Sequence, residues 1–425
     1  MATSARGEFQ ANSVEDVFYL GKTTSGDDLA LTIRGFSPSI LVIGASGTGK
    51  TVGVLRRFIE TGFGLGYVVV YITIKDDFVG LSYPNNNPND KRVMGRFFKD
   101  YYRYYYKILK GTWHVPKNRI RVFVPPFLSD QEVKALRAQY KLSLEKFKLP
   151  IQSMHVEDII DLYGSKGTMM TQYFKLVGEI WQMVKDETSG AEDFLERMSA
   201  EIDERLEEKV ITHKFARIFL NRLRMWVRRG VLTKHSLLAE CLKDPPFLIV
   251  LYFPMSHLSS PDGAVMAIFM YTLFDDLDSM TRAGRRVKCM VVIDDCGEWK
   301  RFASSNEALI SLVQRRGRAL GITRILSVQK MGDLSPLIRE SEGEVFDYRI
   351  ETTMNVGKIA GMSVAYRDCR CHECLFYPRM VFMKWDRGKL RSIRYAKYFV
   401  PPPPVTVWRR DEYLEVMRRE GSWQG

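Results

Sequence analysis

Short apolar runs alternate with helical patterns along most of this chain. Near-continuous β-branched runs, such as the one at residues 67–74, are typical of strands buried on both faces of a parallel sheet. Strands are predicted at residues 40–43, 67–74, 120–124, 247–253, 289–293, 322–328 and 346–352. Helices are predicted at residues 52–60, 264–280 and 306–313. The alternation predicts an α/β fold with a mostly parallel central sheet that helices cover on both faces.

The pattern changes at both ends and in the middle of the chain. Residues 1–38 are predicted as a leader with a small β-hairpin, because two short apolar runs flank a turn rich in Gly and Asp. A main domain is predicted at 39–400, with a helical insertion at about 129–243 and a C-terminal β-hairpin around the turn at 386–388. Residues 401–425 begin with four prolines and form a stiff spacer that precedes either a short helix at 411–419 or a disordered end.

A phosphate-loop pattern directly follows the first strand of the main domain and precedes a helical pattern. Its glycines let successive backbone N–H groups face an anion, and the start of the following helix adds a positive dipole end. The Lys would reach the outer phosphates, and the Thr hydroxyl would bind Mg²⁺. We therefore predict that a nucleoside triphosphate is bound by Gly44, Ala45, Ser46, Gly47, Thr48, Gly49, Lys50 and Thr51.

Acidic residues end a second strand and supply the other half of such a site. The apolar run 289–293 leads into Asp294 and Asp295. Asp294 is predicted to hold Mg²⁺ through water, and Asp295 to polarise the attacking water, with Glu298 as an alternative for that second role.

A third strand, 322–328, ends in the single amide of Gln329, which could sense the γ-phosphate. Several arginines lie before or within that strand: Arg315, Arg316, Arg318 and Arg324. An arginine from an adjacent subunit can stabilise the charge on a transferring phosphoryl group, although salt bridges on a solvated helix end are the simpler interpretation for each one.

The composition of the chain indicates which class of partner the protein binds. The chain has 425 residues, 45% of them hydrophobic, and a formal net charge of +13. This balance favours a polyanionic partner, nucleic acid first and an anionic membrane face second. No apolar stretch approaches the length of a bilayer-spanning helix, and residues 1–20 lack the layout of a signal peptide, so a cytoplasmic protein with no integral membrane segment is predicted.

Three further segments carry candidate chemistry. The segment Cys369-x-Cys371-His372-x-Cys374 could hold zinc, or it could be a loop with free thiols, because its spacing is tighter than that of usual zinc sites. Residues 209–239 carry eight basic side chains and no acidic one, whereas residues 187–208 carry nine acids and two arginines. The basic segment could contact phosphates, but docking on the acidic segment of the same or an adjacent subunit is favoured. Residues 97–110 mix aromatic and basic side chains, which favours a helix with one buried tyrosine face over a base-stacking surface.

The order of these parts resembles the HerA–FtsK superfamily of P-loop motor ATPases, which includes DNA translocases, conjugation and secretion ATPases and some viral packaging motors. The similarity begins at residues 18–21, includes 44–51, 247–253 and 293–295, and is most specific where Gln329 follows Arg318 by eleven residues. The resemblance implies a RecA-like P-loop NTPase with ATP and Mg²⁺ as cofactors. It also implies that Asp294 is the metal-side acid, Gln329 the sensor and Arg318 a finger acting on a neighbouring subunit. One departure is Asp295, where the family usually has Glu.

These observations predict an ATP-dependent translocase of double-stranded DNA that works as a homo-hexameric ring. The alternatives are a viral genome-packaging ATPase, which would be virion-associated, a conjugative or type IV secretion ATPase, and a nucleotide-gated assembly factor with weak ATPase activity. A nuclease, capsid or secretion partner would go with one of these functions. A small-molecule kinase is disfavoured, because it explains neither Gln329 nor the helical insertion.

Overall fold

The structure is a computed structural model, and it describes residues 16–23, 28–33, 37–45, 50–84, 99–111, 114–163, 168–234, 236, 238–254, 258–353, 358–359, 362–363, 379–386, 389–392 and 398–399. Four predicted features lie outside these residues: the centre of the phosphate loop (46–49), the cysteine cluster (369–374), the proline spacer (401–404) and the terminal helix (411–419).

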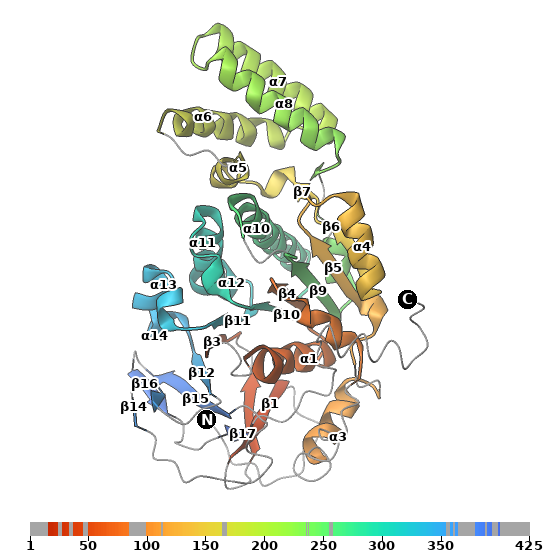
Figure 1. Cartoon of the computed structure of the whole chain (residues 1–425), viewed down its shortest axis with the longest axis vertical. Helices are drawn as coiled ribbons and strands as arrows, with labels where there is room; N and C mark the ends of the chain where they lie inside the picture. The colour runs from red at the N-terminus through yellow and green to blue at the C-terminus, as the bar shows by residue number, and fades with distance from the viewer. Residues whose placement is uncertain are drawn as a thin grey trace.

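A mostly parallel sheet forms the centre of the molecule (Figure 1). Its parallel strands follow the order β12 (Tyr348–Thr353), β3 (Ser39–Ile43), β11 (Ile322–Val328), β10 (Cys289–Ile293), β4 (Val68–Thr73), β9 (Phe247–Tyr252), β5 (Ile120–Val124) and β6 (Ser143–Lys146). The strand that leads into the phosphate loop, β3, is therefore separated from the strand that ends in the two acids, β10, by β11. This arrangement is that of a RecA-like P-loop fold, and it confirms the predicted fold class.

Antiparallel strands extend the sheet beyond β12. They are β15 (Arg379–Asp386), β17 (Tyr398–Phe399), β1 (Asp16–Thr23) and β2 (Asp28–Ile33), while β16 (Lys389–Ser392) pairs with β15. The two hairpins expected from the sequence are β1–β2 and β15–β16. Two short pairs lie apart from this sheet, β7 (Leu149–Pro150) with β8 (Leu232–Thr233) and β13 (Lys358–Ile359) with β14 (Met362–Ser363).

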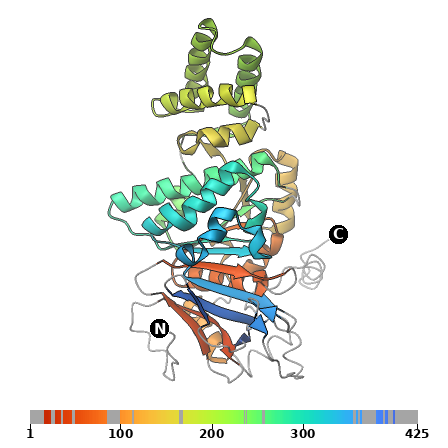
Figure 2. The same ribbon diagram turned by 90° about the vertical axis from the view of Figure 1, so that its left-hand side faces the viewer.

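Helices cover both faces of the sheet (Figure 2). Because strand side chains alternate between faces, Ile40 and Val42 pack in the core that contains residues of α1 (Arg56–Gly64) and α3 (Lys99–Ile108). Leu41 and Ile43 pack in the opposite core, with residues of α10 (Ser260–Arg282). Burial on both faces explains why these strands are continuous apolar runs in the sequence.

The remaining helices of the main domain are short. They are η1 (Lys50–Leu55), η2 (Asp76–Ser82), η3 (Lys117–Arg119), α4 (Asp130–Tyr140), η4 (Ile151–Ser153), α9 (Leu238–Lys243), η5 (Cys296–Glu298), α11 (Ala303–Ile310), η6 (Ser311–Arg315), α12 (Arg316–Ala319), η7 (Met331–Asp333), α13 (Pro336–Glu340) and α14 (Glu342–Val345).

A helical extension stands at one end of the molecule, above α10 and α11 in Figure 1. It comprises α5 (Val156–Tyr163), α6 (Thr168–Lys185), α7 (Ala191–Glu207) and α8 (His213–Arg228). The predicted insertion began at residue 129, but α4 packs beside β6, and β6 pairs with β5, so residues 130–146 belong to the sheet layer. Within the described residues, no helix is both long enough and apolar enough to cross a bilayer.

Candidate nucleotide-binding site

The phosphate loop starts where two neighbouring strands end. Gly44 follows β3, and its backbone N–H donates to the carbonyl of Val328, the last residue of β11, at 3.2 Å. Lys50 opens η1, which continues into α1. Its buried Nζ donates to the carbonyl of Gly44 and, at 3.3 Å, to that of Ala45. Burial lowers the pKa of the Lys50 ammonium, although the nearby carboxylates of Asp295 and Asp294 act in the opposite direction.

The hydroxyl and the carboxylate predicted to share Mg²⁺ are in contact. Thr51 Oγ1 donates to Asp294 Oδ2 at 2.8 Å. Asp294 is only 1% exposed, and its Oδ1 accepts a hydrogen bond from Ser327 Oγ at 2.6 Å. Both carboxylate oxygens are therefore held in place, and the donor set of hydroxyl and carboxylate suits a hard cation such as Mg²⁺.

Asp295 adopts an unusual backbone conformation beside this pair. Its φ is +50° and its ψ is 47°, in the left-handed region that non-glycine residues rarely occupy. Its backbone N–H donates to Asp294 Oδ1 at 3.0 Å and to Ser327 Oγ at 3.1 Å. Its buried Oδ1 has no hydrogen-bond partner among the described residues. A strained backbone and an unpaired buried oxygen are typical of functional sites.

Two residues of the site were missed by the sequence analysis. Lys75 lies just beyond β4, and its Nζ is 2.5 Å from Asp295 Oδ2 and 3.3 Å from Asp294 Oδ2. Burial lowers the pKa of Lys75, but the two carboxylates outweigh that effect and the net pKa lies above its usual value. Ser327 holds Asp294 from β11. Both residues could have been found from the predicted strand ends, because polar side chains at the carboxyl ends of adjacent parallel strands gather at one edge of the sheet.

Gln329 and Glu298 lie at the same edge of the sheet. Gln329 directly follows β11, one residue after the carbonyl that accepts from Gly44, and its side chain is exposed. Glu298 lies in the short turn after β10, also exposed, and its backbone N–H donates to the carbonyl of Asp295 at 3.0 Å.

Arg318 lies outside this site within one chain. It belongs to α12, which precedes β11, and it is 57% exposed with its guanidinium 3.8 Å from Asp347 Oδ1. This position is at the amino end of β11, whereas the phosphate loop is at the carboxyl end. Within one chain, Arg318 and the phosphate loop therefore lie at opposite ends of β11.

The hypothesis that Arg324 reaches a phosphoryl group is wrong. Arg324 is 0% exposed near the amino end of β11, and it donates to the carbonyls of Ser37 at 2.6 Å and Val313 at 3.3 Å. Burial lowers its pKa to about 10. Its role is to tie backbone segments together at the amino edge of the sheet. Arg316 forms an ion pair with Asp275 at 2.8 Å, as the salt-bridge interpretation expected.

No family model and no curated protein sequence matches the chain. The fold is similar to that of VirB4 of Thermoanaerobacter pseudethanolicus, with 13% identity, a TM-score of 0.49 and coverage of 92% of this chain and 97% of that one. A second similar structure is the pCW3 conjugation coupling protein TcpA in its monomer form with ATPγS, with 13% identity, a TM-score of 0.30 and coverage of 97% and 72%. A third is EccC (ATPases 2 and 3) of Thermomonospora curvata in complex with a signal sequence peptide, with 10% identity, a TM-score of 0.31 and coverage of 100% and 51%.

The chain's own geometry defines its class. The strand order places β11 between β3 and β10, the phosphate-loop Thr contacts the first of the acids that follow β10, and the phosphate-loop Lys lies within the electrostatic influence of both acids. The protein has the architecture of a RecA-like P-loop NTPase.

Proposed function

We propose that this protein binds ATP with Mg²⁺ and hydrolyses it as a motor of the HerA–FtsK type. The observation that carries this proposal is the 2.8 Å contact between Thr51 and Asp294, two residues 243 positions apart in the sequence. The contact supports the proposal, because a hydroxyl and a carboxylate beside the phosphate loop are the groups that hold Mg²⁺ in phosphoryl transfer by P-loop NTPases.

Each residue of the site has a role in this proposal. Lys50 and the loop 44–51 hold the phosphates, and Thr51 with Asp294 would hold Mg²⁺, which neutralises phosphate charge when it is bound. Asp295 orients the attacking water and accepts its proton through the oxygen that lacks a protein partner, while Lys75 holds its other oxygen. Gln329 contacts the γ-phosphate from the neighbouring strand, and Arg318 completes the site of an adjacent subunit.

The polymer that the motor moves is a separate question. Net charge of +13 supports nucleic acid, and double-stranded DNA in a homo-hexameric ring is the reading that the family resemblance favours. The proposal of a conjugative or secretion ATPase is supported at least as well as that of a DNA translocase, because the described residues hold no feature that selects duplex DNA over another cargo. A nucleotide-gated assembly factor is the alternative outside the motor class, and the shorter acid at Asp295 is its main support.

The test compares ATP turnover of the wild type, Lys50→Ala and Asp294→Asn, with and without duplex DNA. Loss of the phosphate or Mg²⁺ contacts should lower kcat by about 10²-fold or more. Lys134→Ala, an exposed lysine on α4, is the matched control and should leave turnover unchanged. DNA should stimulate the wild type if DNA is the cargo.

Each possible failure has a distinct meaning. If Lys50→Ala turns over ATP as fast as the wild type, ATP hydrolysis does not take place at the site proposed around Lys50. Robust turnover that DNA leaves unchanged would favour a protein-moving secretion ATPase. If wild-type protein binds ATP without turning it over and ATP only stabilises an oligomer, the assembly factor replaces the motor.

A further inference from the structure

Opposite charges are segregated on the two outer helices of the extension. Helix α7 exposes an acidic stripe at Glu192, Glu196, Asp203 and Glu207, and helix α8 exposes a basic stripe at Lys214, Arg217, Arg224 and Arg228. Neighbours in each stripe are three, four or seven residues apart, which is one or two helical turns, so each set lies along one face of its helix. Both stripes span about 20 Å at the 1.5 Å rise per residue of a helix.

The two stripes do not neutralise each other within one chain. Helices α7 and α8 pack together through buried apolar side chains, among them Met198 and Ile202 on α7 and Phe215 and Phe219 on α8. Among the described residues, no ion pair within 4.0 Å joins α7 to α8. The two arginines of the acidic segment pair locally, Arg197 with Asp193 and Glu187 and Arg205 with Glu208. The basic helix therefore docks on the acidic helix of the same chain, as one of the sequence predictions expected, but it does so through apolar side chains and without an ion pair among the described residues.

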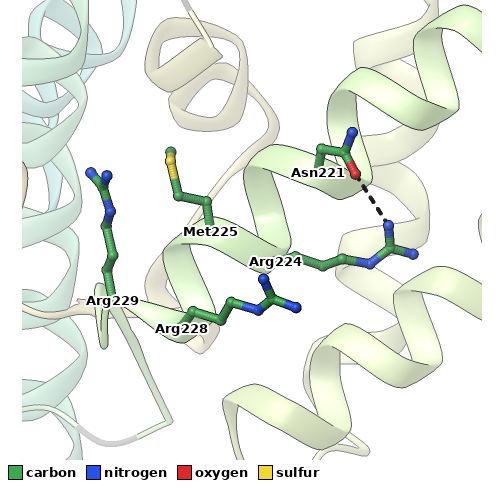
Figure 3. Close-up of a pocket in the computed structure, with 5 residues that line it drawn as sticks. All are labelled: Asn221, Arg224, Met225, Arg228 and Arg229. Atoms are coloured by element: carbon green, nitrogen blue, oxygen red, sulfur yellow. Dashed lines mark hydrogen bonds between the residues drawn. The ribbon is translucent and has the colours of Figure 1, made fainter.

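The basic stripe is open to a partner. An open pocket of about 620 Å³ is lined by Asn221, Arg224, Met225, Arg228 and Arg229. Figure 3 shows Arg224 and Arg228 extending to one side of Met225 and Arg229 lying on the other side. The only dashed contact among these residues is the hydrogen bond from Arg224 to Asn221 Oδ1, at 3.3 Å.

Apolar side chains along the basic stripe favour a protein partner over a phosphate backbone. Ile218 is 44% exposed and Met225 is 38% exposed, and both lie beside the arginines on α8. A nucleic-acid backbone offers charge and hydrogen-bond acceptors but little for these side chains to pack on. Exposed Met and Arg together are typical of protein interfaces.

We propose that the basic stripe of α8 binds the acidic stripe of α7 on a second copy of this chain. One chain carries both halves of the contact, because the stripes are opposite in charge and similar in length, and no ion pair joins them within the described residues of one chain. Because different surfaces of the two copies meet, the contact is head-to-tail, and repetition of it closes a ring or extends a filament. This inference rests on the proposed function only in that a ring motor needs such contacts, and it can fail while ATP hydrolysis stands.

A charge-swap experiment on the full chain tests the proposal. The basic stripe is reversed by Lys214→Glu, Arg217→Glu and Arg224→Glu, and the acidic stripe by Glu196→Arg, Asp203→Arg and Glu207→Arg. Lys214→Glu and Arg217→Glu add acids near the start of α8, and Glu207→Arg adds a base at the end of α7, which the helix dipoles favour. The other three changes lie inside the helices, away from the terminal turns. Assembly is followed by sedimentation velocity at low salt with an ATP analogue.

Each reversal alone should raise the protein concentration needed for half-assembly by about tenfold or more, which corresponds to about 1.4 kcal/mol. An equal mixture of the two reversed proteins should assemble again, because each copy then meets a neighbour of opposite charge. One chain that carries both reversals should also assemble. Reversal of three exposed bases on α3, Lys99→Glu, Arg103→Glu and Lys107→Glu, is the matched control and should have no effect on assembly.

Three results would overturn the proposal. In the first, the mixture stays unassembled although each protein keeps its helical circular dichroism and its ATP binding. In the second, reversal of the basic stripe leaves assembly intact and weakens DNA binding, which would assign α8 to nucleic acid. In the third, the wild-type chain remains a monomer under all conditions. Loss of ATPase activity in Lys50→Ala with unchanged assembly would leave this inference standing.

Discussion

At the residue scale, the two carboxylates of the candidate site differ in how completely hydrogen bonds hold their oxygens. Asp294 has both oxygens held by hydroxyls of Thr51 and Ser327, whereas Asp295 keeps one buried oxygen without a partner among the described residues. A fully held carboxylate suits metal binding, and a partly held one suits contact with a moving water. Glu298 is exposed and has a less defined environment.

This contrast predicts which acid activates water. Asp295→Asn should lower kcat by about 10²-fold or more, because the amide cannot accept a proton, and the effect falls within the usual range for a general base. Glu298→Gln should change kcat by less than about threefold. Steady-state ATPase assays at saturating ATP, with nucleotide affinity measured separately, make the comparison. The opposite ranking would make Glu298 the general base.

A second residue-scale prediction concerns pH. Asp276 on α10 accepts a hydrogen bond from Ser236 at 2.5 Å, and burial raises the pKa of its carboxyl to about 6. The native state therefore binds more protons than the unfolded state between about pH 4 and pH 6, and stability falls as pH rises through that window. Asp276→Asn should raise the free energy of unfolding by on the order of 1 kcal/mol at pH 7, after allowance for partial exposure, and should leave it unchanged at pH 4. Urea unfolding of both proteins at both pH values measures this change in the free energy of unfolding. An equal change at pH 4 and pH 7 would show that ionisation of the Asp276 carboxyl is not its cause.

At the element scale, the helical extension has its own aromatic interior. Trp181 on α6 is 0% exposed, its ring centroid is 4.4 Å from that of Phe194 on α7, and its Nε1 donates to the carbonyl of Ile151 at 3.2 Å. Tyr163 on α5 stacks on Phe219 of α8, with ring centroids 4.9 Å apart. These contacts link α6 to α7 and α5 to α8 without involving residues of the nucleotide site.

Removal of one anchor should loosen the extension selectively. Trp181→Ala leaves a cavity and an unpaired carbonyl and should destabilise this region by about 3–5 kcal/mol. Hydrogen exchange should then accelerate in α6, α7 and α8, while ATP affinity should stay within about twofold of wild type, because the site is distant and independent. Met183→Ala, which removes a 53% exposed side chain from the same helix, is the control. Faster exchange around β3 and η1 would instead show that the extension and the site unfold together.

At the scale of the whole molecule, the sheet places Arg318 and the phosphate loop at opposite ends of β11. If Arg318 acts in catalysis, it acts on another subunit. The predicted ring and the predicted trans-acting arginine are therefore linked by geometry.

Mixed subunits test that link. Arg318→Ala should lower kcat by about 10³-fold, in the range of other arginine fingers, with ATP affinity nearly unchanged. A mixture with Lys50→Ala should regain activity, because a Lys50→Ala chain supplies Arg318 to the intact phosphate loop of its neighbour. ATPase activity is measured as a function of the mixing ratio of the two variants. If every mixture is only as active as the sum of its two inactive components, Arg318 has no role in a neighbouring site and serves only in its ion pair with Asp347.

Much of the fold could be predicted from the sequence. The strands at β5, β10 and β11 match the predicted runs residue for residue, because burial on both faces forces an unbroken apolar pattern. The phosphate loop and the acids after β10 could also be identified, since each is a local pattern with a chemical requirement. The insertion boundary was placed too early, because periodicity alone cannot tell a helix beside the sheet from a helix of the extension.

By itself, the sequence determined the order of strands and helices, the phosphate-loop pattern and the pair of acids, because each of these depends on neighbours along the chain. Only the tertiary structure decided that Lys75 and Ser327 hold those acids, that Arg324 is buried, and that α7 and α8 pack through apolar side chains with no ion pair between them among the described residues. These relations depend on strand order and helix packing, which bring together residues that no local pattern connects.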